Sequence, residues 1–208
     1  MFGVSERRRK NTFFFVTCIV LENFFLFLPS IILKMFADHI YYPLVKALRH
    51  RPDEIAVSVG EKTCDNRHFA MLVAPIMNEL DTFSDDTVAL LLEDEPLTLA
   101  AMVACLLCGK TIVPVQAEWS DAQRSQVMQA SGATRLLSKE SMYYYYWVSY
   151  EDAICRIDSG YLPERDIPRA ARVFDFGEDG QLSERIFSAD DLFLYFCAPY
   201  FKNIVKNR

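Results

Sequence analysis

The sequence predicts an α/β domain built on a doubly wound, mostly parallel sheet, and two patterns support that class. Residues 87–92 form an unbroken apolar run, which is typical of a strand buried on both faces of a parallel sheet. Further strands are expected at 111–115 and 134–138, and a helical segment precedes each of them. An alternation of strand and helix with short connections indicates a doubly wound sheet.

Turn and capping residues bound the two intervening helices. Pro96 occupies the favoured first position of the earlier helix, and Gly109 is expected to end it. Ser120 is the expected N-cap of the second helix, over residues 121–130, and Gly132 is expected to end it. Each helix therefore has a physical reason to start and to stop where the pattern places it.

A helix, a hairpin and a second helix are expected ahead of the sheet. The pattern predicts a short amphipathic helix over residues 39–49 and a hairpin whose strands lie at 54–59 and 62–64. Asp65 or Asn66 then caps the second helix. Apolar side chains recur along it at helical spacing: Phe69, Leu72, Val73, Ile76 and Leu80.

The pattern weakens after Lys139. The aromatic run at 143–147 predicts a strand that packs on other rings, in preference to a ligand-binding surface. Residues 172–176 predict a strand, 176–180 a turn, and 192–196 a strongly apolar strand.

Composition limits the classes of function. The chain has 208 residues, is 51% hydrophobic and carries a formal net charge of -6, which favours a buried core and argues against nucleic-acid binding. None of its seven glycines falls in a G-x-G-x-x-G or G-x-x-x-x-G-K pattern, so we expect no glycine-rich phosphate cradle. Cysteines scattered without a framework suggest a reducing compartment. They are Cys18, Cys64, Cys105, Cys108, Cys155 and Cys197.

Residues 1–34 form a basic and very hydrophobic leader ahead of an acidic body. The stretch at 13–33 is long enough to cross a bilayer as a helix, although Glu22 and Pro29 interrupt it. Three readings stay open. The leader is upstream sequence read from too early a start, with Met35 as the true start, or a membrane anchor, or a cleaved or interfacial segment.

Few side chains offer catalytic chemistry. Cys105-x-x-Cys108 has metal-ligand spacing, but it lies in an apolar helix and no second pair accompanies it, so two small buried residues are expected. The histidines and the paired aspartates are interpreted as surface, turn or cap residues. They are His39, His50, His68, Asp85–Asp86 and Asp190–Asp191. An independent hydrolase with a triad finds little support, because the chain has no G-x-S-x-G.

Several short motifs follow one another along residues 51–138. The most specific is Leu106-Leu-Cys-Gly-Lys-Thr-Ile-Val-Pro-Val115, which Gln116 follows. The others are Arg51-Pro-Asp-Glu-Ile-Ala-Val57, Lys62-Thr-Cys-Asp-Asn-Arg-His-Phe69, Asp86-Thr-Val-Ala-Leu-Leu-Leu92, Gln123-Arg124 and Ser131-Gly-Ala-Thr-Arg-Leu-Leu137.

In their order along the chain, these motifs resemble the opening part of the adenylate-forming superfamily, which comprises acyl-CoA synthetases, luciferases and peptide-synthetase adenylation domains. The motif at 106–115 is similar to "LkaGaayVPld", with Gln116 where aspartate is usual. The motif at 62–69 is similar to "lTYxeL", with Cys64 in place of tyrosine. The resemblance implies the N-terminal subdomain of that fold. It also implies a parent enzyme that uses ATP and magnesium to convert a carboxylic acid into an acyl-adenylate, which then passes to a thiol.

The family's phosphate loop, of the type T-S-G-T-T-G-x-P-K, follows an apolar strand that residues 188–196 resemble closely. Here the sequence continues Cys197-Ala-Pro-Tyr-Phe-Lys-Asn203 instead. The resemblance therefore implies a chain without that loop, without the aspartate that holds the ribose, and without the hinge and small C-terminal domain. We expect a truncated portion that is inactive alone, with no catalytic, cofactor-binding or metal-binding residues of its own.

These expectations divide the chain into a leader (1–34), an α/β subdomain (35–138) and a less defined continuation (139–208). The leading hypothesis is a cytoplasmic fragment of an ATP-dependent acid–thiol ligase. The alternative is a non-enzymatic α/β interaction domain that is anchored in a membrane through residues 13–33. An incomplete sheet has an open edge, so we also expect aggregation or reliance on a partner.

Overall fold

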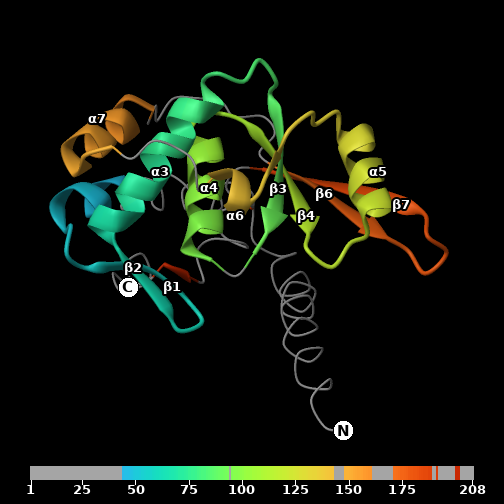
Figure 1. Ribbon diagram of the computed structural model, residues 1–208, viewed down its shortest axis with the longest axis horizontal. Coiled ribbons are helices and arrows are strands. Elements are labelled where there is room, and N and C mark those ends of the chain that lie inside the picture. Colours follow the sequence, from blue (N-terminus) through green and yellow to red (C-terminus); the bar gives the residue numbers. More distant parts are fainter. Residues whose placement is uncertain are drawn as a thin grey trace, which may run out of the picture. The chain divides into compact units, whose positions relative to one another are not determined.

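The computed structural model describes residues 44–93, 95–142, 148–160, 171–188, 191 and 200–201. Figure 1 shows how their helices and strands are arranged. Among these residues, five strands form one sheet in the order β5-β3-β4-β6-β7, and two more strands form a separate hairpin.

The five-stranded sheet is parallel across four of its strands. β3 (Thr87–Leu92) pairs with β4 (Thr111–Gln116) on one side and with β5 (Leu136–Leu137) on the other. β6 (Ala171–Phe176) is parallel to β4, and β7 (Leu182–Phe187) returns antiparallel to β6. The predicted α/β fold with a mostly parallel sheet is therefore confirmed.

Helices lie on both faces of this sheet, which is the meaning of doubly wound. The chain passes from β3 to β4 through α4 (Pro96–Leu107) and returns past β3 to β5 through α5 (Asp121–Ser131). Right-handed crossovers that lead in opposite directions place their helices on opposite faces. Accordingly, Val88 and Leu90 pack in the cluster that contains α4, whereas Ala89 packs in the cluster that contains Val127 of α5.

The hairpin and the remaining helices pack on the α4 side. The hairpin consists of β1 (Ile55–Val59) and β2 (Lys62–Asp65), and α3 (Asn66–Leu80) follows it directly. α7 (Tyr150–Gly160) packs against α3 through Ala153, Ile154 and Ile157. A helix over residues 44–50 and the short α6 (Lys139–Met142) complete this side.

The caps form as predicted. Asp65 is the N-cap of α3 and accepts from the backbone N–H of His68 at 2.7 Å. Ser120 caps α5 in a reciprocal capping box with Gln123. Gly132 adopts φ +75° directly after α5, a left-handed conformation that glycine adopts without a steric penalty.

Most element boundaries agree with the prediction to within one residue, and two elements are shorter than predicted by two residues or more. The strand expected over 134–138 comprises only Leu136–Leu137, because Ser138 and Ser141 exchange hydrogen bonds that turn the chain into α6. The helix expected to end at Gly109 ends at Leu107, and the backbone N–H groups of Cys108 and Gly109 bond back to Ala104 and Leu106.

Three elements of the structure have no counterpart in the sequence prediction, namely α6, α7 and β7. The start of α7 carries a readable signal, because Ser149 and Asp152 form an N-terminal capping pair ahead of the apolar residues Ile154 and Ile157. β7 has no such signal, because its side chains are mostly exposed and polar. Its position follows from the predicted turn after Phe176, which the structure confirms.

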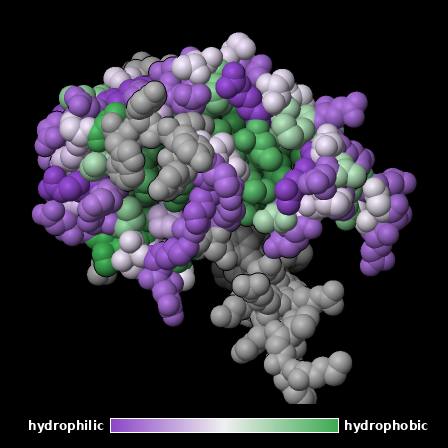
Figure 2. Space-filling view, in the orientation of Figure 1, coloured by the Kyte–Doolittle hydropathy of each residue, from purple (hydrophilic) through white to green (hydrophobic). Residues whose placement is uncertain are grey.

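Apolar side chains are mostly buried within the described residues. Only Ile55 and Ile186 are large apolar side chains that are exposed there, by 45% and 57%. Figure 2 shows hydrophilic residues around the rim of the face in view and hydrophobic ones toward its centre.

Several expectations fall outside the described residues. These are the hydrophobic stretch at 13–33, the aromatic run at 143–147, the apolar strand at 192–196, His39 and Asp190. Within the part of the chain that is described, no helix is both long enough and apolar enough to cross a membrane.

The capping box of α5 yields a test of the fold. Replacing Ser120 by Ala removes the hydroxyl that accepts from the Gln123 N–H at 3.3 Å, and should lower the free energy of unfolding by about 1 kcal/mol. Urea unfolding of the full chain measures the change. Ser125→Ala, at an exposed position in the same helix, is the matched control and should leave stability equal or slightly higher. Equal losses in both variants would contradict the assigned cap.

Candidate functional site

The carboxyl ends of the parallel strands are the first place to look for a site, because ligands of open α/β sheets bind there. The segments that leave these ends are residues 93–95 after β3, 117–120 after β4, residue 138 and α6 after β5, and 177–181 after β6. Of these segments, residue 94 lies outside the described part of the chain.

A three-residue ion network stands at the ends of β3 and β5. Glu95 Oε1 accepts from Lys62 Nζ of the hairpin and, at 2.8 Å, from Lys139 Nζ of α6. Glu93 Oε2 accepts from the backbone N–H of Lys139 at 3.0 Å. The network therefore joins the hairpin, the start of α4 and the start of α6.

The surroundings of Glu95 favour its charged form. Its side chain is 18% exposed, and hydrogen bonds from Lys139 and then Lys62 hold its pKa below the usual 4.5. The same contact with Glu95 raises the pKa of Lys139 above its ordinary value. Glu95 is the N-cap residue of α4, yet its side chain makes no cap hydrogen bond, because the carboxylate is directed to the two lysines.

The end of β4 is closed by an aromatic contact. Trp119 meets Phe176 of β6 edge to face, with ring centroids 5.4 Å apart. Arg124 donates to the carbonyl of Ala117 at 2.7 Å and so holds the loop between β4 and α5. Gln116, which stands where the resembling family has aspartate, ends β4 and accepts from the Trp119 N–H through its backbone carbonyl.

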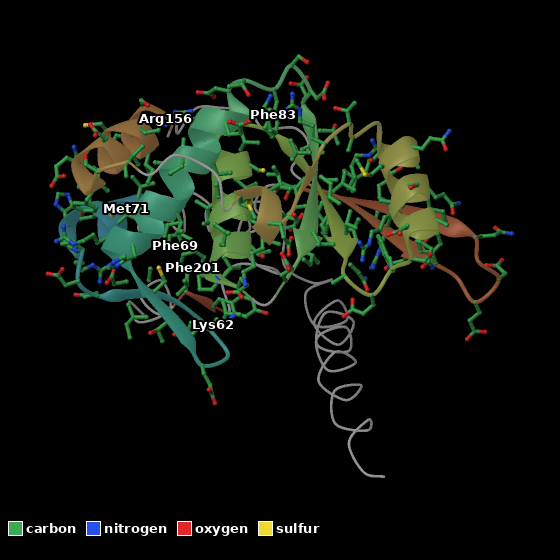
Figure 3. All side chains as sticks on the ribbon, in the orientation of Figure 1. Lys62, Phe69, Met71, Phe83, Arg156 and Phe201 are labelled. Atoms are coloured by element: carbon green, nitrogen blue, oxygen red, sulfur yellow. The ribbon has the colours of Figure 1, made fainter. Side chains whose placement is uncertain are left out.

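A second cluster of polar side chains lies away from this edge, where α7 packs on α3. Arg156 donates to Asp81 at 2.6 Å, to Asn78 at 3.0 Å and to the carbonyl of Met77 at 3.4 Å. Figure 3 places Arg156 on α7 beside the end of α3. All these contacts fasten one helix to another, so the cluster is structural.

The two histidines within the described residues lie at the surface, as predicted. His50 is exposed, and His68 is exposed with its Nδ1 2.8 Å from the Asp65 carboxylate in the first turn of α3. Of the paired aspartates, Asp85 accepts from the Thr134 hydroxyl, and Asp191 accepts from Ser188. The contact of Asp191 with Ser188, three residues earlier, is the cap role expected from the sequence. The contact of Asp85 with Thr134 instead joins the loop ahead of β3 to the loop ahead of β5.

Burial makes three of the cysteines poor nucleophiles. It raises the pKa of the Cys64 thiol to about 12 and that of Cys108 to about 11, and it also raises that of the fully buried Cys105. Cys105 and Cys108 thus pack as small buried or half-buried residues. Across the described ranges, no three His, Cys, Asp or Glu side chains lie close enough together to hold a metal ion.

The architecture defines the class of protein as a doubly wound α/β protein, and the comparisons specify the family. A family model described as AMP-binding enzyme matches residues 46–173. This chain therefore belongs to the AMP-binding enzyme family, which confirms the resemblance seen in its motifs. A comparison with curated protein sequences gives no match.

Solved structures share the fold. The adenylation domain AlmE of Vibrio cholerae, determined with glycyl-adenosine-5'-phosphate, is 15% identical with a TM-score of 0.58 and covers 74% of this chain and 36% of AlmE. The N-terminal subdomain of Klebsiella oxytoca NpsA is 19% identical with a TM-score of 0.50, covering 70% of this chain and 39% of that one. VinN is 11% identical with a TM-score of 0.53, and the match covers 73% of this chain and 46% of VinN. This chain spans less than half the length of each.

Glu95→Gln tests the ion network. The substitution removes the charge that both lysines contact and should lower the free energy of unfolding at pH 7 by about 1 kcal/mol at low salt, and by less in 1 M salt. The pKa of Glu95 is lowered in the folded state, so its contribution is present above the unfolded value of about 4.3 and disappears as the pH falls through the lower folded value. The difference from wild type should therefore shrink below about pH 4.

Urea unfolding at pH 7 and below about pH 4, each at low salt and in 1 M salt, measures this effect. Glu61→Gln, in the exposed turn of the same hairpin, is the matched control and should change stability little. A Glu95→Gln effect that persists unchanged at acid pH, or that Glu61→Gln reproduces, would contradict the network.

Cysteine labelling tests the burial of the thiols. At pH 8, iodoacetamide should modify the exposed Cys155 fastest among the four cysteines of the described residues, because the raised pKa values keep Cys64, Cys105 and Cys108 protonated. Peptide mapping by mass spectrometry gives the rate at each site. Labelling of Cys108 as fast as that of Cys155 would show that the packing of α7 on α3 leaves this thiol open.

Proposed function

We propose that this chain supplies the N-terminal, sheet-building part of a carboxylate-activating enzyme and is catalytically incomplete by itself. The complete enzyme joins ATP and a carboxylic acid to give an acyl-adenylate and pyrophosphate, and then transfers the acyl group to a thiol. In this proposal magnesium and ATP belong to the complete enzyme, and the chain described here provides scaffold.

The observation that carries the proposal is the position of the family match. It covers residues 46–173, and in the structure these residues form the hairpin, α3, α4, α5 and the central strands of the sheet. The solved adenylation domain AlmE, which shares the fold, is bound to an aminoacyl-adenylate, and this chain corresponds to 36% of it. Extending that chemistry to the parent of this chain is the proposal.

The charged side chains at the carboxyl edge support a structural role. Acyl-adenylate formation needs fixed positive charge and backbone N–H groups around the phosphates as the carboxylate attacks. Here Lys62 and Lys139 both contact Glu95, and Arg124 is bonded to a loop carbonyl. These three side chains are therefore engaged in contacts within the chain, which supports a structural role for them.

A cytoplasmic location is part of the proposal. The complete enzyme would need ATP, which is available there. The four cysteines within the described residues are free thiols, which supports a reducing compartment.

An ATP–pyrophosphate exchange assay tests the proposal. The purified full chain, with Mg·ATP and a set of amino acids, aromatic acids and fatty acids, should give no exchange above a mock preparation purified from cells with an empty vector. A complete adenylation domain assayed in parallel shows that the assay works. Exchange that rises in proportion to the concentration of the chain, for any of the acids, would overturn the claim that it is inactive alone.

A further inference from the structure

The β1–β2 hairpin has a neighbour that comes from far along the chain. Val57 of β1 lies opposite Cys64 of β2, and on its other side it forms an antiparallel bridge with Phe201. Three backbone segments therefore lie side by side, with Val57 in the centre. Phe201 occupies the outer edge of β1, where the chain returns after the whole sheet has been built.

The side chain of Phe201 belongs to the core. It is 3% exposed and meets Phe69 of α3 edge to face, with centroids 5.4 Å apart and ring planes at 90°. Phe69 itself is fully buried, and Tyr200 packs against the same cluster. Figure 3 shows the two phenylalanines next to one another, between the hairpin and the start of α3.

The hairpin depends on such contacts. An isolated two-stranded hairpin is marginally stable in water and needs an apolar face packed against another element. β1 buries Ala56, Val57 and Val59, but β2 has no fully buried residue. The Lys62 contact with Glu95 restrains the turn end of the hairpin. At the Val57 position, the ring of Phe201 joins β1 to α3.

We propose that residues 200–201 are a clasp that holds the β1–β2 hairpin closed on α3, with the backbone of Phe201 extending β1 and its ring locking the hairpin to Phe69. The clasp is a conformational device of the fold itself and does not depend on whether the chain binds nucleotide. Releasing it frees the hairpin while the five-stranded sheet stays folded, because β3, β4 and β5 pair without the hairpin.

The chain contains its own reporter of the clasp. Cys64 faces Val57 across the hairpin, one strand away from Phe201. Its thiol is half-buried, and burial raises its pKa to about 12, so it reacts slowly while the hairpin is closed. Cys105 in α4 is fully buried and reports opening of the central core instead.

Phe201→Ala in the full chain tests the clasp. We expect the rate of iodoacetamide labelling at Cys64, measured at pH 8 by peptide mapping, to rise at least about tenfold, because local opening becomes more frequent. The rate at Cys105 should stay within about twofold of wild type. Ile186→Ala, which removes an exposed apolar side chain from β7, is the control and should change neither rate.

Phe201→Leu keeps the experiment decisive if Phe201→Ala unfolds the whole chain. Leucine retains apolar volume but loses the aromatic edge contact with Phe69, so labelling at Cys64 should rise by a smaller factor with Cys105 unchanged. The proposal is overturned if both variants label Cys64 at the wild-type rate. It is equally overturned if Phe201→Leu accelerates Cys64 and Cys105 in parallel. Neither result bears on the exchange assay, which tests the proposed function separately.

Discussion

Burial of α4 on nearly every side is the constraint on which the rest of this structure depends. All ten residues of α4 from Thr98 to Leu107 are buried. A helix that is apolar all round must be enclosed, because no face of it can be left to water at low cost. The sheet encloses it on one side, and α3 and the hairpin enclose it on the others. α7 then covers α3, so the layers on this face are built outward from α4.

The other face of the sheet is packed more sparsely. α5 buries only Val127 and Ser131, and the apolar cluster on this face is much smaller than the one around α4. Arg172 of β6 compensates in part, since its guanidinium donates to the carbonyls of Ala130 and Ser131 at the end of α5. The α4 face of the sheet is therefore covered by several elements, whereas the opposite face is covered mainly by α5.

The polar contacts among the described residues serve mainly to join elements of the fold. Two charged side chains each join separate elements: Glu95 joins the hairpin to α4 and α6, and Arg156 joins α7 to α3. Buried thiols have raised pKa values, and the histidines that are described lie at the surface. Membership in the AMP-binding enzyme family rests on the family-model match to residues 46–173.

The sequence by itself determined the elements whose causes are local. The apolar run of β3, the capping box at Ser120 and the left-handed Gly132 each act within a few residues, so the parallel strands of the sheet, α4 and α5 could be predicted. Tertiary structure alone decided the pairs that are distant in sequence. Phe201 against Phe69 and Lys139 against Glu95 depend on where the backbone returns, and neither local spacing nor composition encodes that position. β7 is the intermediate case, because its polar side chains have no period of their own and only pairing with β6 makes it a strand.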